Sequence, residues 1–437
     1  MATIDSFTRG GPDVAIRVLL VAENTSTRWG GEAILPYHYL RVLLKRGIDV
    51  QLIVHERCRE ELESLFPEQQ DRLHFIADRP LQKLFHWCSR WLPHRVAEAT
   101  VGLANQMLTQ AAQRGLLRTL TDANTIVHQP IPVAPRFPSM IYDVGAPVII
   151  GPMNGGMEYP SAFRGRESLP GRAVIDLGRA VSDLVQRLIP GKRRAQALLV
   201  ANDRTRLALT DASDARVILL PENGVDLAQW GVPAVHQAIE PHSAAARFVF
   251  MGRLVDWKAL DIALEAICQV DNVELDVIGD GPMRAAWCAL AQTLGLGERV
   301  RFLGWLPQSD CAQILQESRG LLLPSLYECG GAVVLEAMAC AQPVIATAWG
   351  GPLDYLDASC GFLVSPSSRE AMIDGFRDAM QLLVEQPALG ERMGAAGRAR
   401  VEEHFNWESK VDTMLKVYES ALASSTARAE ERVTATA

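Results

Sequence analysis

The sequence predicts an α/β protein with two doubly wound parallel sheets, one in each half of the chain. Short apolar, β-branched runs alternate with longer amphipathic stretches from one end to the other, which is the pattern of βαβ units with buried strands. There are twelve such runs, too many for one common sheet. A stretch without helical or strand period, Trp230–Ala245, separates the first six runs from the last six. Two doubly wound halves therefore fit better than one sheet.

Each predicted element follows from its local pattern. The predicted strands are Ala15–Ala22, Val50–Val54, Thr125–His128, Pro147–Ile150, Leu198–Ala201 and Arg216–Leu220, then Phe248–Gly252, Val273–Ile278, Val300–Leu303, Leu321–Leu323, Pro343–Ala346 and Phe362–Val364. Asn406 is a candidate cap for a final helix, whose apolar stripe is Val411, Met414, Leu415, Tyr418 and Leu422. We place the linker between the halves near 228–246. Residues 424–437 lack a core pattern, so we expect a disordered tail there.

Composition excludes several classes of protein. The 437 residues hold 43 Lys and Arg against 51 Asp and Glu, a net charge of −8, which argues against a dedicated nucleic-acid binder. Eight scattered cysteines without a C-x-x-C pair predict reduced thiols in a reducing compartment. The sequence shows neither a signal-peptide pattern nor a run of 18 apolar residues. We therefore expect a cytoplasmic protein, either soluble or peripheral at the inner face of a membrane.

The first strand leads into a glycine pair. Gly30-Gly31 stands where a helix is predicted to begin, and glycines at a helix N-terminus let amide N–H groups approach a phosphate. The alternative is a tight turn that needs glycine for backbone reasons alone. The pattern is not G-x-G-x-x-G, and no acidic residue reads as a ribose ligand after the second strand.

The second half of the chain contains more candidate ligand-binding residues than the first. Arg253 follows a strand and Lys258 stands five residues later at a helix start; two cations there suit a diphosphate, although both could equally be solvated side chains. Gly279 ends the next strand in a glycine turn. This turn either serves only to connect the strand to the helix or forms part of a ligand site.

The sharpest feature is the segment Pro324–Ala339, which follows the strand Leu321–Leu323. Glu328 is predicted on the loop at the strand's carboxyl end, Gly330 and Gly331 open a helix, and Glu336 lies one to two turns inside it. An acidic residue in an apolar helix is costly to bury without a partner, and sugar or ribose hydroxyls are suitable partners for a carboxylate. Alternatively, Glu336 faces solvent.

This segment resembles the Glu-x7-Glu signature of retaining glycosyltransferases of family four, which have the GT-B fold. Other matches occur in chain order: Gly30-Gly31 with the family's glycine loop, Gly252-Arg253-Leu254 and Lys258 with its diphosphate clamp, and Asn223–Asp226 with its interdomain turn. Pro343–Ala346 and Gly350-Gly351 match the strand and loop after the signature helix. The matches span about 400 residues and are weakest between 55 and 120.

The resemblance implies domains and roles. It implies a Rossmann-like acceptor-binding domain over 1–228, a Rossmann-like nucleotide-sugar-binding domain over 229–405 facing it across a cleft, and a helix over 406–423 that crosses back to the first domain. By the same resemblance Glu336 binds the ribose and Glu328 contacts the donor sugar, while Arg253 and Lys258 bind the diphosphate. Residues that also take part in donor binding are Gly31, Gly279, Gly330, Gly331 and Ala332. His128, at a strand end, resembles the histidine that many members aim at the donor sugar, although such a histidine can equally be structural.

The expected reaction is transfer of a sugar, with retention, from a UDP- or GDP-sugar to a glycan, glycolipid or small molecule. The family pattern Glu-Pro-Phe-Gly is here Glu328-Cys329-Gly330-Gly331, so the identity of the sugar is open. No Asp-x-Asp motif follows a strand, which agrees with the family's independence of metal, and no cofactor is expected beyond the donor. The loop around Asn154, Gly155 and Gly156 is expected to line the acceptor side, or else only to connect elements.

Two further hypotheses concern partners. Leu81–Trp91 mixes tryptophans with basic residues, and Lys192-Arg193-Arg194 is a second basic run. Both suit peripheral membrane contact; alternatively, Trp87 and Trp91 form a core stripe with exposed basic flanks. The alternatives to a transferase are another enzyme on a similar scaffold, such as a nucleotide-sugar epimerase or a pyridoxal-phosphate-dependent phosphorylase, and a non-catalytic nucleotide-sugar-binding partner of another transferase. The sequence leaves the oligomeric state open.

Overall fold

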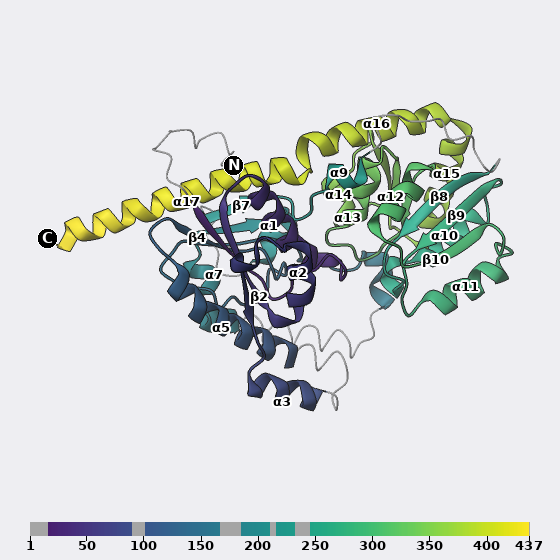
Figure 1. Ribbon diagram of the computed structural model, residues 1–437. Helices are drawn as coiled ribbons and strands as arrows, with labels where there is room; N and C mark the ends of the chain where they lie inside the picture. The colour runs from purple at the N-terminus through teal and green to yellow at the C-terminus, as the bar shows by residue number, and fades with distance from the viewer. Residues whose placement is uncertain (1–15, 90–100, 167–184, 210–215, 232–244, 437) are drawn as a thin grey trace. The chain divides into compact units, whose positions relative to one another are not determined.

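The computed structural model describes residues 16–89, 101–166, 185–209, 216–231 and 245–436 (Figure 1). The chain divides into two compact units. The N-terminal unit comprises Met1–Gly156, Leu169–Glu222 and Lys410–Ala437, and the C-terminal unit comprises Met157–Ser168 and Asn223–Ser409. Most of the predicted linker, 232–244, lies outside the described residues.

Each unit is built on one parallel sheet, so the predicted fold class of two doubly wound α/β units is confirmed. The sheet of the N-terminal unit has seven strands in the order β3-β2-β1-β4-β5-β6-β7, and every neighbouring pair is parallel. Its strands are β1 (Arg17–Val21), β2 (Asp49–His55), β3 (Leu73–Ile76), β4 (Thr125–Gln129), β5 (Val148–Met153), β6 (Ala197–Val200) and β7 (Val217–Leu219). Strand order reverses between β1 and β4, as in doubly wound folds.

Helices cover both faces of this first sheet. They are α1 (Leu35–Lys45), α2 (Arg59–Leu65), α3 (Pro80–Ser89), α5 (Leu103–Leu120), α7 (Gly191–Arg194), α8 (Asp203–Ala208) and part of α17, with 3-10 turns at Gly31–Ile34, Glu56–Cys58 and Gln70–Arg72. Leu117 of α5 packs with Leu19 and Val127 on one face. Alternate residues of a strand point to opposite faces, and His128, next to Val127, contacts α1 and α17 on the other face.

The sheet of the C-terminal unit has six strands in the order β10-β9-β8-β11-β12-β13, again all parallel. The strands are β8 (Ala246–Met251), β9 (Val273–Ile278), β10 (Val300–Gly304), β11 (Leu321–Leu323), β12 (Val344–Thr347) and β13 (Gly361–Val364). The helices are α9 (Leu227–Trp230), α10 (Leu260–Ile267), α11 (Arg284–Thr293), α12 (Gln308–Gln316), α13 (Ala332–Ala339), α14 (Pro352–Tyr355), α15 (Arg369–Glu385) and α16 (Pro387–His404), with 3-10 turns at Ser161–Arg166 and Asp256–Lys258.

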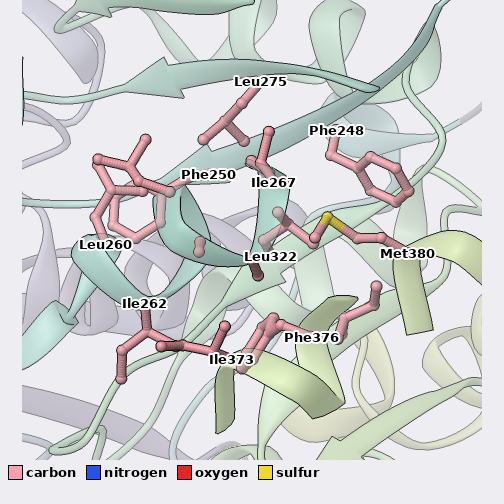
Figure 2. Packing of buried hydrophobic residues seen from close by; sticks show 14 of the residues in the cluster. Phe248, Phe250, Leu260, Ile262, Ile267, Leu275, Leu322, Ile373, Phe376 and Met380 are labelled. Carbon is pink, nitrogen blue, oxygen red and sulfur yellow. The ribbon is translucent and has the colours of Figure 1, made fainter. Parts of the chain in front are cut away.

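A buried apolar layer lies on each face of this second sheet. On one face, Phe248 and Phe250 of β8 pack against α10 and against Phe376 and Met380 of α15 (Figure 2). On the other face, Val249 belongs to one buried apolar cluster with Leu315 of α12 and Leu335 of α13. Because both faces are covered, the strands are continuously apolar, which is the pattern that predicted them.

The last helix, α17 (Trp407–Thr436), begins in the C-terminal unit and belongs to the N-terminal unit from Lys410 onward. Asn406 caps it as predicted, since its side chain accepts the Ser409 N–H at 2.8 Å. Val411, Met414 and Tyr418 of the predicted stripe are buried. Where a disordered tail was expected over 424–437, α17 continues to Thr436, and this stretch is rich in Ala, Glu and Arg, which are strong helix formers.

The twelve predicted strands each coincide with an observed strand, and β3 was missed. β3 pairs only with β2 at the sheet edge, and His74 and Phe75 are half-buried rather than buried, so its four residues carry no clear apolar run. No helix of the described residues is long and apolar enough to cross a membrane.

Candidate functional site

Four loops of the C-terminal unit meet at the carboxyl edge of its sheet. They follow β9, β8, β11 and β12, which are neighbours in that order, and parallel strands bring their carboxyl ends to one edge. A Cβ at Gly279 would lie 2.0 Å from the Gly252 carbonyl oxygen, so the first two loops touch through their backbones. The Leu326 N–H donates to the Trp257 carbonyl at 2.8 Å, and the Gly351 N–H donates to the Glu328 carbonyl at 2.7 Å. Backbone hydrogen bonds and close packing thus join all four loops.

The charged residues of these loops are Arg253, Lys258 and Glu328. Lys258, in the 3-10 turn before α10, forms an ion pair with Glu328, and only 13% of each side chain is exposed. Gly252 lies beside the Lys258 stem, since a Cβ there would be 3.6 Å from Lys258 Cε. The Arg253 side chain is exposed and has no hydrogen-bond or ion-pair partner among the described residues. The structure therefore brings Gly252, Arg253, Lys258, Gly279 and Glu328 together.

The glycine pair after Glu328 opens α13 as predicted. Gly331 has a φ of 72° and is the N-cap of the helix, with Ala332 its first residue; a Cβ at Gly331 would lie 3.1 Å from Glu328 Cγ. Gly330 packs against Gly351, where a Cβ would lie 2.1 Å from the Gly330 carbonyl oxygen. The left-handed backbone at Gly331 and the close approach at Gly351 explain why these two positions are glycine.

Glu336 lies in the second turn of α13, in an otherwise apolar helix. Its side chain is half-buried and has no hydrogen-bond partner within the described part of the chain. Burial raises the pKa of Glu336 to about 7, because a low-dielectric environment disfavours the charged carboxylate. A carboxylate with unused acceptor capacity, next to loops that carry cations, is suited to accept hydroxyl donors from a ligand.

Gly31 belongs to the N-terminal unit, in the 3-10 turn that leads into α1. Gly30 and Gly31 are exposed and have positive φ values of 65° and 57°. A Cβ on either would meet nothing within 4 Å, so the backbone conformation, not crowding, requires glycine here. The neighbouring Glu32 carboxylate accepts the Val133 N–H at 2.9 Å and fixes the turn to the loop after β4.

His128 is held inside the N-terminal unit by burial and by hydrogen bonds at both ring nitrogens. Its side chain is fully buried, its Nε2–H donates to the Gly151 carbonyl at 2.7 Å, and its Nδ1 accepts from the Tyr418 hydroxyl at 2.7 Å. Burial lowers the pKa of His128 to about 4, which keeps the ring neutral. With both nitrogens used inside the N-terminal unit, we assign His128 to the core and remove it from the catalytic set.

Asn154, Gly155 and Gly156, the residues expected on the acceptor side, contact Glu222 and residues of α8. The Asn154 amide donates to Glu222 at 2.7 Å, and the Gly155 N–H donates to the Thr205 hydroxyl at 3.0 Å. Gly156 has a φ of 71°, and a Cβ there would lie 2.6 Å from Ala208 Cβ. The loop is thus rigidly packed, with Asn154 buried and Gly156 exposed.

Among the described residues, no three His, Cys, Asp or Glu side chains gather in a group that could hold a metal ion. The residues predicted to bind the donor fall into two sets. Arg253, Lys258, Gly279, Glu328, Gly330, Gly331, Ala332 and Glu336 lie in the C-terminal unit, and Gly31 lies in the N-terminal unit. The structure adds Gly351 and Trp257 to the first set as backbone partners of the site loops.

Comparison with known proteins shows that the part of the chain that carries these loops is similar to glycosyltransferases. Residues 234–400 match the family model described as "Glycosyl transferases group 1". A D-inositol 3-phosphate glycosyltransferase of Mycobacterium marinum is 33% identical over 193 residues, which cover 42% of this chain and 40% of that protein. A lipopolysaccharide core biosynthesis glycosyltransferase of Rhizobium meliloti, LpsD, is 29% identical over 196 residues, which cover 44% and 54%. The matches therefore span about half or less of these relatives.

Among solved structures, Anabaena HepE in complex with UDP aligns with a TM-score of 0.64 at 13% identity, and the alignment covers 93% of this chain and 100% of HepE. At that identity the likeness shows the fold alone. The fold is therefore that of GT-B glycosyltransferase structures, as expected, and residues 234–400 are similar to group 1 glycosyltransferases.

Proposed function

We propose that this protein is a retaining, metal-independent glycosyltransferase that transfers a sugar from a UDP- or GDP-sugar to a hydroxyl of a glycan, glycolipid or small molecule. The observation that carries the proposal is the assembly of Arg253, Lys258, Glu328 and Glu336 on one sheet edge and on the helix that starts there. Two cations and two carboxylates in this arrangement match the diphosphate, the sugar and the ribose of a nucleotide sugar. The match of residues 234–400 to group 1 glycosyltransferases supports the same assignment.

Each group has a distinct task in this proposal. Glu336 accepts the ribose hydroxyls, and Arg253 and Lys258 neutralise the diphosphate and stabilise the departing nucleotide. Glu328 faces the donor sugar and stabilises its oxocarbenium-like transition state. The sugar C1–O bond to the diphosphate breaks while the acceptor oxygen bonds to C1 on the same face, and the acceptor proton passes to an oxygen of the leaving diphosphate.

The donor base is proposed from the relatives. HepE has been solved with UDP and with UDP-glucose, which makes UDP the first candidate and GDP the second. The acceptor is proposed to bind mainly to the N-terminal unit, near Asn154, Gly155 and Gly156. The named relatives act on inositol phosphate and in lipopolysaccharide core synthesis, which supports a sugar, polyol or glycolipid acceptor here.

We place the protein in the cytoplasm, with peripheral contact at the inner face of a membrane. Leu81 and Trp87 on α3 are 47% and 58% exposed, as suits an interfacial helix; Arg90, Trp91 and Arg95 lie outside the described residues. The second basic run contributes less, because Lys192 is buried and donates to the Pro135 carbonyl. Cosedimentation with anionic vesicles tests this: we expect binding that Leu81→Ser and Trp87→Ser weaken, and an unbound wild type contradicts it.

The function is tested by release of nucleoside diphosphate from a panel of UDP- and GDP-sugars in EDTA, with candidate acceptors. We expect turnover of one donor and an NMR anomeric signal of retained configuration in the product. Glu336→Gln should lower kcat/KM about 100-fold, since the amide keeps only one acceptor oxygen and loses the charge that strengthens both hydrogen bonds. Glu391→Gln, an exposed glutamate of α16, is the matched control. Tight nucleotide binding without turnover would instead favour the non-catalytic partner.

A further inference from the structure

The segment Met157–Phe163, here named the strap, belongs to the C-terminal unit although it directly follows the acceptor-side loop. The N-terminal unit ends its first stretch at Gly156, and the C-terminal unit takes in Met157–Ser168. Phe163 is 6% exposed and packs in the same apolar core as Phe248 and Leu260. The strap is thus built into the C-terminal unit by a buried aromatic anchor.

Two aromatic residues of the site loops hold the strap by hydrogen bonds. The Trp349 Nε1–H donates to the Glu158 carbonyl at 2.8 Å, and the Tyr327 hydroxyl donates to the Met157 carbonyl at 3.4 Å. The Tyr159 ring lies 5.5 Å from the Tyr327 ring, in a tilted pair. Tyr327 directly precedes Glu328, and Trp349 directly precedes Gly350, so both loops at this side of the site are fastened to the strap.

The strap also packs against the backbone of Glu328. Gly350 has a φ of 71°, and a Cβ there would lie 2.5 Å from Met157 Sδ and 2.2 Å from the Glu328 carbonyl oxygen. The same carbonyl accepts the Gly351 N–H. The Met157 thioether, Gly350 and the Glu328 peptide therefore lie in close contact, and only glycine fits between the other two.

We infer that the strap is a positioning element of the donor site, with Met157, Tyr327 and Trp349 as positioning residues that hold the Glu328 carboxylate in register with the donor sugar. This inference rests on the proposed function for the role of Glu328. Small displacements of a group that faces the reacting atoms lower the rate strongly. Within the described residues, no hydrogen bond or ion pair joins the strap to the Glu336 side chain, so the strap should affect the sugar end of the donor and leave nucleotide binding intact.

The test compares Met157→Ala and Trp349→Phe with Met380→Ala, a matched truncation of a fully buried methionine in the core of the same unit (Figure 2). Three quantities are measured: kcat and KM for the nucleotide sugar, Kd for the nucleoside diphosphate, and hydrogen exchange of residues 326–331 and 348–351. We expect both strap variants to lower kcat about tenfold or more, with nucleotide Kd changed less than about twofold and faster exchange in both loops. Met157→Leu, which conserves volume, should restore most of kcat.

Met380→Ala should lower Tm without these effects when assayed below its transition. Unchanged kcat and unchanged exchange in Met157→Ala overturn the inference, and so does an equal loss of nucleotide affinity and kcat in Met157→Ala and Met380→Ala. If the wild type neither binds nor turns over any nucleotide sugar, the proposed function fails, and the exchange measurement alone decides about the strap. Faster exchange of the two loops in Met157→Ala then supports the anchoring, and unchanged exchange rejects it.

Discussion

At the scale of single residues, the proposed role of Glu336 makes donor binding depend on the protonation of its carboxyl group. In the ligand-free protein, burial raises the pKa of Glu336 to about 7. Half or more of the molecules therefore carry a neutral Glu336 side chain at and below that pH. Ribose hydroxyls bind best to the ionised carboxylate, which accepts two hydrogen bonds. Binding therefore releases a proton below about pH 7, and affinity should increase as pH rises toward 7 and level off above it.

This first prediction is checked by titrating a UDP- or GDP-sugar into the protein between pH 5.5 and 8.5. A nucleotide sugar is the better ligand because it lacks the terminal phosphate whose own ionisation falls in this range. We expect affinity to rise about tenfold over the lower half of the range and the pH dependence to disappear in Glu336→Gln. A flat profile in the wild type would contradict the assigned role.

His128 gives a second prediction at the same scale. Its two hydrogen bonds, to Gly151 and to Tyr418, lie inside the N-terminal unit, so Tyr418→Phe should leave a buried ring nitrogen without a donor and destabilise the fold by about 1–3 kcal/mol. Chemical denaturation measures the loss, and turnover per folded molecule should stay within about threefold. A fall in turnover of two orders of magnitude in His128→Gln at unchanged stability would return His128 to the catalytic set.

At the scale of elements, the loops depend on glycines that pack backbone against backbone. Gly279 combines a φ of 123° with a Cβ position 2.0 Å from the Gly252 carbonyl oxygen, so Gly279→Ala must displace the loop that carries Arg253. We expect it to destabilise the protein by about 2 kcal/mol or more and to weaken nucleotide binding. Gly297→Ala is the control, because a Cβ at Gly297 meets nothing within 4 Å. Equal stability of the two variants in urea would contradict this account.

The elements themselves were largely predictable from local pattern. Continuous apolar runs identified every strand except β3, whose half-buried edge position leaves no such run. The start of α13 after Gly331 and the Asn406 cap followed from turn and capping chemistry. Contacts between distant segments were not predictable: no spacing shows that Lys258 pairs with Glu328, that Tyr418 bonds to His128, or that Met157 packs against Gly350.

At the scale of the whole molecule, α17 should stabilise the N-terminal unit through its buried residues between Lys410 and Leu422. Lys410 donates to the Pro221 and Glu222 carbonyls, and Tyr418 and Leu422 are buried; Ala423, Thr426 and Ala427 are exposed. A chain ending at Ala427 keeps Lys410, Tyr418 and Leu422, and its Tm should stay within about 2 °C of that of the full chain. A chain ending at Ser409 should fail to fold cooperatively, since it uncovers the face around His128. Differential scanning calorimetry of the two truncations distinguishes these outcomes.

The most direct test of the central claim, that the C-terminal unit binds a nucleotide-sugar donor, is a thermal-shift panel with UDP, GDP, ADP, CDP and NAD in EDTA. A ligand at about 100 times its Kd adds about 2.7 kcal/mol to the free energy of unfolding, which raises Tm by several degrees at roughly 2–4 °C per kcal/mol. We predict a rise with one nucleoside diphosphate, UDP first and GDP second, that is lost in Glu336→Gln and kept in Glu391→Gln. A rise with NAD alone, or none with any nucleotide, would contradict the account.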